Sequence, residues 1–146
     1  MLFKANAMRI SLTVFLMVYG SSLFAAEPAW LTSMISECDS GVTKECLDVG
    51  VAYTRGELKG KKVVSDKAKA KHYINKGVKQ GQQNCLQGDP MDCYTLGLLF
   101  FQGGGVVPAD IPRGIEFLER SCRGGYGEAC AWLDNSGLGG GNRRKR

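Results

Sequence analysis

Six cysteines are the residues of this chain with the clearest capacity for chemistry. They fall into three units of identical spacing, C-x-x-G-x-x-x-x-C, which span Cys38 to Cys46, Cys85 to Cys93 and Cys122 to Cys130. These units contain every cysteine of the chain. Thiols at such positions could form disulfides, bind a metal ion or act as nucleophiles, and the spacing helps to decide between these chemistries.

Disulfide formation is the chemistry that the spacing favours. The sequence has no C-x-x-C pair and only one histidine, His72, so a zinc site is not predicted. A catalytic thiol is disfavoured because no histidine lies near a cysteine in the sequence and the cysteines are even in number. Six cysteines allow many pairings, of which local pairing within each unit is the simplest. Each local bridge would contribute about 2–3 kcal/mol.

The residues between the cysteines predict the elements that hold each unit: a helix end, a tight turn and the start of a second helix. Gly41, Gly88 and Gly125 occupy the place where a helix C-terminus takes a left-handed residue. In the central unit Asp89 can cap the following helix, with Pro90 at its first position. Three units with one glycine offset indicate an internal repeat.

Apolar residues recur at helical spacing along the chain. Gly50 and Gly97 fall at matching positions of two predicted helices and predict close helix packing. Between the predicted helix that ends at 55 and the one that begins near 66, residues 57–65 are expected to form a lysine-rich loop. Four predicted helices comprise residues 28–38, 43–55, 90–102 and 127–134. Another begins at about 66, with its end left open between Gly81 and Cys85, and one more runs from 110 or 111 to about 122.

Two pairs of these segments carry a family resemblance. The pattern L-G-x-x-Y-x-x-G of Sel1-like repeats, relatives of the tetratricopeptide repeat, is similar to residues 49–56 and 96–103. The second-helix pattern D-x-x-K-A-x-x-x-Y/F is loosely matched at 66–73 and 110–117. Cysteines eight positions apart resemble the cysteine-rich branch of secreted bacterial proteins. Departures are a long first repeat, Val49 in place of leucine and a truncated final helix.

The resemblance covers about Cys38 to Leu133 and implies an all-α fold, a short α/α solenoid of helix pairs. It implies two full pairs with a half-repeat at each end, and therefore a short concave binding surface. It also implies disulfides between successive helices, namely Cys38–Cys46, Cys85–Cys93 and Cys122–Cys130.

Composition sets the expected domains and location. The chain has 146 residues, of which 44% are hydrophobic, enough for one domain. Lys4, Arg9 and the apolar run that follows predict a secretory signal peptide at residues 1–26. Residues 27–135 are the expected repeat domain, and 136–146 a flexible basic tail. No other stretch could span a bilayer, so we expect a secreted or periplasmic protein without a membrane anchor after cleavage.

Lysines form the second candidate site. Without the predicted leader and the four basic residues of the tail, the chain has a net charge of −1, which disfavours nucleic acid as a partner. Within 59–79, however, eight lysines are concentrated. They could be a solvated surface or a patch for an acidic envelope component. The candidate patch is Lys59, Lys61, Lys62, Lys67, Lys69 and Lys71.

The residues themselves favour binding over catalysis. No serine has the S-x-x-K spacing of a serine β-lactamase, and no other catalytic motif is present. We therefore expect a scaffold or adaptor that binds a protein or peptide, with no cofactor and no metal. Three alternatives remain. The first is an envelope immunity protein that binds a toxin, and the second is a structural envelope protein. The third is a β-lactamase-like or peptidoglycan-related enzyme, because some proteins of the cysteine-rich branch are described in this way.

Overall fold

The computed structural model describes residues 26–138. Most of the expected leader (1–26) and of the expected basic tail (136–146) therefore lies outside the described residues. The described part confirms the predicted all-α class. Its elements are α2 (Ala29–Ser40), α3 (Thr43–Arg55), β1 (Glu57–Leu58), β2 (Lys61–Lys62), α4 (Lys67–Leu86), α5 (Pro90–Gln102), α6 (Ile111–Arg123) and α7 (Gly127–Asn135).

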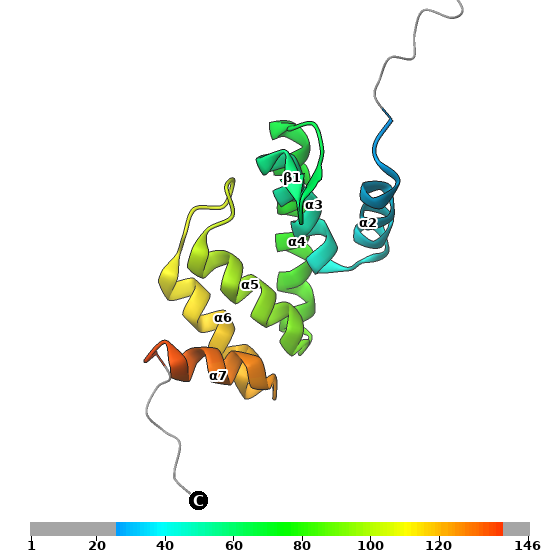
Figure 1. Cartoon of the computed structure of the whole chain (residues 1–146). Helices are drawn as coiled ribbons and strands as arrows, with labels where there is room; N and C mark the ends of the chain where they lie inside the picture. Colours follow the sequence, from blue (N-terminus) through cyan, green and yellow to red (C-terminus); the bar gives the residue numbers. More distant parts are fainter. Residues whose placement is uncertain (1–25, 139–146) are drawn as a thin grey trace, which may run out of the picture.

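The helices pack as successive pairs (Figure 1). Helix α3 packs along α4, and α5 packs along α6, so the two full pairs have the same construction. Helix α2 packs on α3 at one end, and α7 packs on α6 at the other. The predicted arrangement of two full pairs between two single helices is confirmed.

Glycines permit the close approach inside each full pair. A Cβ on Gly50 would lie 2.3 Å from Ile74 Cγ1 of α4, and a Cβ on Gly97 would lie 2.6 Å from Leu118 Cγ of α6. Real Cβ atoms do not approach other atoms so closely, so each position requires glycine or a rearranged neighbour. The predicted role of these two glycines in packing is confirmed.

Each cysteine unit forms a turn between two helices, and a disulfide joins the two sides of that turn. The turn glycines Gly41, Gly88 and Gly125 have φ values of 112°, 100° and 93°, in the left-handed region. The Cα–Cα separations across the three bridges are 4.6, 4.8 and 4.7 Å. Three disulfides of this kind indicate that the domain forms in an oxidising compartment. The bridges are Cys38–Cys46, Cys85–Cys93 and Cys122–Cys130, the pairs that the resemblance implied.

The segment expected as a loop at 57–65 contains a β-hairpin instead. Strands β1 and β2 pair in antiparallel fashion through a turn at Lys59 (φ 51°) and Gly60 (φ 77°). The Val63 N–H donates to Gly56 O at 2.9 Å, and Val63 packs against the buried cluster between α2, α3 and α4. Strands of two residues are too short to show an alternating pattern, which is why the hairpin was not predicted.

Helix α4 runs without interruption through Gly81 to Leu86, which settles the end that the sequence left open. A Cβ on Gly81 would lie 2.7 Å from Thr43 Cγ2 of α3, so this glycine again serves helix contact. The part of α4 that follows Gly81 places Cys85 at the start of α5, beside its partner Cys93.

Candidate binding groove

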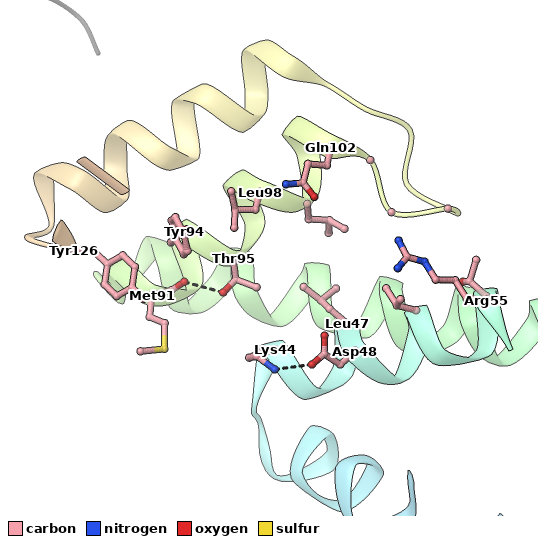
Figure 2. A pocket seen from close by; sticks show the side chains of 16 residues that line it. Lys44, Leu47, Asp48, Arg55, Met91, Tyr94, Thr95, Leu98, Gln102 and Tyr126 are labelled. Carbon is pink, nitrogen blue, oxygen red and sulfur yellow. Dashed lines mark hydrogen bonds and ion pairs between the residues drawn. The ribbon is translucent and has the colours of Figure 1, made fainter. Parts of the chain in front are cut away.

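A groove of about 540 Å³ lies between α3 and α5 (Figure 2). It lies between the two full helix pairs, where α3 and α5 make few direct contacts. The lining is mostly apolar in its middle and polar at its two ends. Its residues are Lys44, Leu47, Asp48, Val51, Thr54, Arg55, Met91, Tyr94, Thr95, Leu98, Leu99, Gln102, Gly103, Gly104, Gly105 and Tyr126.

Helical spacing produces the two walls. On α3, Leu47 and Val51 are four residues apart and project from one face. On α5, Met91 and Leu98 lie two turns apart and do the same. Because Gly50 holds α3 against α4 and Gly97 holds α5 against α6, the apolar side chains of these walls are left facing each other across the groove.

Aromatic side chains line one end of the groove. The ring of Tyr94 on α5 lies 5.0 Å from the ring of Tyr126, the residue that precedes α7. The Tyr126 hydroxyl donates to Glu128 Oε2 at 3.1 Å. Desolvation and the hydrogen bond with this carboxylate raise the pKa of Tyr126. Met91 lies beside them and is 57% exposed, which leaves an apolar side chain open to a ligand.

A glycine loop closes the opposite end. Gly103 ends α5, and a Cβ on Gly105 would lie 2.7 Å from Thr54 Cγ2 in the last turn of α3. The loop therefore crosses from α5 to α3. Arg55 lies beside this loop, and the carboxamide of Gln102 lies at the same end (Figure 2).

The other two charged groups of the groove neutralise each other. Lys44 Nζ lies 2.6 Å from Asp48 Oδ2, one turn away on α3. The hydrogen bond with Asp48 raises the pKa of Lys44. Apart from this pair and Arg55, the lining residues carry no formal charge.

The predicted candidate residues lie elsewhere. The six cysteines are disulfide-bonded and none lines the groove. The candidate lysine patch divides into three lysines on the hairpin and three in the first turns of α4, and these six do not line the groove either.

The environments of the patch lysines differ. Lys69 is paired with Glu27 at 2.5 Å, and Lys61 lies over the Trp30 ring at 5.5 Å from its centroid. Five of the six make no ion pair with any residue in 26–138: Lys59, Lys61, Lys62, Lys67 and Lys71.

A smaller cavity lies beside Tyr53 where α2 meets α4, with Lys69 and His72 among its lining residues. Burial, with a further effect from the Glu27 carboxylate, raises the pKa of Tyr53 to about 12. Lys69 lies over the same ring at 5.0 Å, and Tyr73 stacks on it at 5.9 Å. These contacts join α3, α4 and Glu27, which precedes α2, so the cluster has a structural role at this end.

Sequence reasoning did not find the groove. Most of its residues lie in predicted helices, whereas Gly103, Gly104, Gly105 and Tyr126 lie between them, and the prediction assigns one apolar face to each helix. The signal was present in α5, where Leu98 and Leu99 follow the packing residues Leu96 and Gly97. A helix that is apolar around most of its circumference has a second face to cover.

Among residues 26–138, no group of three or more His, Cys, Asp or Glu side chains is arranged to hold a metal ion. In the same range no helix combines the length and apolarity needed to cross a membrane. No protein-family model matches this chain, and no curated protein matches it.

Proposed function

We propose that this chain is a secreted or periplasmic, Sel1-like repeat protein that binds a segment of another protein in the groove between α3 and α5. The observation that carries the proposal is the groove itself, with an apolar floor, aromatic side chains at one end and a cation at the other. Helical repeats bind partners through surfaces built in this way from neighbouring repeats.

The apolar floor supports a peptide ligand because its side chains are accessible without any rearrangement. Met91 is 57% exposed, and Tyr94, Leu98 and Tyr126 are partly exposed. Apolar and aromatic side chains of this kind are the groups that dominate binding energy in protein interfaces. The disulfides join α2 to α3, α4 to α5 and α6 to α7, and glycine contacts hold α3 on α4 and α5 on α6, so a ligand would meet a groove that is already formed.

The test compares two exposed apolar positions on neighbouring helices. Met91→Glu places a charge in the groove, whereas Leu86→Glu places the same charge at a position that is 71% exposed and outside it. The protein and both variants are crosslinked in native envelope material, and the captured proteins are identified by mass spectrometry.

We expect one specific protein to be captured by the original chain and by Leu86→Glu, and to be lost with Met91→Glu. Thermal unfolding of both variants verifies that the fold is kept. Equal capture by both variants would show that the groove is not the binding surface.

A further inference from the structure

One end of the groove carries a positive charge that no described residue neutralises. Arg55, the last residue of α3, is exposed and makes no ion pair within residues 26–138. Lys44 and Asp48, the other charged residues of the groove, are paired with each other. The groove thus presents one uncompensated guanidinium, which is suited to a carboxylate because the two can form parallel charge-assisted hydrogen bonds.

The surroundings of Arg55 strengthen this preference. Residues 55–67, which comprise Arg55, the hairpin and the start of α4, contain five basic and two acidic side chains, a net charge of +3, whereas the remaining described residues contain eight basic and twelve acidic ones, a net of −4. The hairpin that begins two residues after Arg55 carries three of these lysines. The electrostatic potential at this end of the groove therefore attracts anions.

The glycine loop gives this end a second property. Gly105 lies against Thr54, so the loop reaches α3 one residue before Arg55 and closes the groove there. A segment that lies along the floor cannot continue straight past this point. Arg55 lies at this end of the groove (Figure 2), so a chain that terminates there, by contrast, would place its terminal carboxylate beside the guanidinium.

The length of the groove sets the size of the segment. Lys44 and Arg55 mark its two ends on α3, and eleven residues of helix rise about 16 Å. An extended peptide advances about 3.3 Å per residue, so about five residues fit.

We propose that the groove binds the carboxyl-terminal segment of a partner protein, with about five extended residues along the floor and the terminal carboxylate on Arg55. This inference rests on the proposed function and specifies the chemistry of its partner. The chain's own tail is disfavoured as the occupant, because the four basic residues from Arg143 to Arg146 would lie on an apolar floor beside another cation.

The experiment uses the full chain with its disulfides formed and two libraries of random peptides, one displayed with free carboxyl termini and one with free amino termini. A peptide that is enriched from the first library is then synthesised as the free acid and as the C-terminal amide. Binding of both forms is measured by fluorescence anisotropy for the original chain, Arg55→Gln and Arg120→Gln. Arg120 is the matched control because it is an exposed arginine of α6 outside the groove.

We expect enrichment from the free-carboxyl library and binding about tenfold weaker for the amide than for the acid. Arg55→Gln should remove that difference, and Arg120→Gln should keep it. Equal affinity for acid and amide, or enrichment from the free-amino library alone, would overturn the inference while leaving the groove as a peptide site. Enrichment from neither library would overturn both this inference and the proposed function.

Discussion

A Cβ on Gly114 of α6 would lie 2.9 Å from the carbonyl oxygen of Gly97 on α5, so the two helices meet backbone to backbone at this point. The same added atom would lie 2.7 Å from the backbone nitrogen of Phe101. Backbone atoms cannot move aside as a flexible side chain can, so the crossing of α5 and α6 is fixed by these glycines.

Gly114→Ala is therefore expected to destabilise the domain by about 1–3 kcal/mol, although alanine favours helix more than glycine does. Denaturant unfolding under non-reducing conditions measures the loss. Gly127→Ala is the control, because nothing lies within 4 Å of a Cβ at that helical glycine. A change at Gly114 no larger than that at Gly127 would contradict the close crossing.

The terminal disulfide Cys122–Cys130 is expected to hold α7 in place. Helix α7 has nine residues, fewer than the 12–15 or so that an isolated helix needs in water, and it packs mainly on α6. Replacing both cysteines by alanine should remove protection of the α7 amides from hydrogen exchange while leaving α3 and α4 protected.

A variant that lacks the central bridge, Cys85–Cys93, is compared with the variant that lacks Cys122–Cys130. Removing Cys85 and Cys93 opens a loop of equal length and should lower the global free energy of unfolding by about 2–3 kcal/mol, because that bridge joins the two full helix pairs. Slow exchange in α7 without its own disulfide would show that packing alone holds this helix.

Asp92 joins three helices through one carboxylate oxygen. Its Oδ2 accepts from Thr43 Oγ1 of α3 at 2.8 Å and from Asn84 Nδ2 of α4 at 2.6 Å. Thr43 is 2% exposed, so removal of the carboxylate would leave a buried hydroxyl without its acceptor. We expect Asp92→Ala to destabilise the domain by about 1–3 kcal/mol.

A double-mutant cycle separates this interaction from other effects of Asp92, such as its place in the first turn of α5. Thr43→Val keeps the shape of the side chain and removes the hydroxyl. The double variant should be less destabilised than the sum of the two single variants, and strict additivity would show that the hydrogen bond contributes nothing.

The fold could be predicted from the sequence to a large extent because its signals are local. Asp89 was predicted to cap α5, and its side chain accepts from backbone N–H groups in the first turn of that helix. Asp66 and Asp110, near the predicted starts of two other helices, cap α4 and α6 in the same way. The end of α4 was not predictable, because Gly81 resembles a helix stop in sequence. Its role in contact with Thr43 depends on a residue of another helix.

The groove could not be predicted from the sequence, for a related reason. It is formed by α3 and α5, whose separation depends on the length of α4 between them and on the packing of Gly50 and Gly97. Nothing in the sequence distinguishes Arg55 from an ordinary surface arginine. Only the three-dimensional arrangement shows that it lies beside the Gly103–Gly105 loop and lacks an ion pair within residues 26–138.

The contact between Glu27 and Lys69 should make stability depend on pH in the acid range. Lys69 Nζ lies 2.5 Å from Glu27 Oε1, and this hydrogen bond lowers the pKa of Glu27 below its usual value. A carboxyl whose pKa is lower in the folded state stabilises the fold above its unfolded pKa of about 4.3. That stabilisation is lost as the pH falls from there through the folded-state pKa.

Glu27→Gln is accordingly expected to lower the free energy of unfolding by about 0.5 kcal/mol at pH 7, because both partners are partly exposed and water screens the pair. The difference from the original chain should disappear as the pH falls below about 4. Denaturant unfolding at a series of pH values measures it. Glu37→Gln, at an exposed carboxylate without an ion pair to any of residues 26–138, should match the original chain at every pH. A Glu27→Gln deficit that stays constant into acid would mean that lost packing, and not the charge of Glu27, causes it.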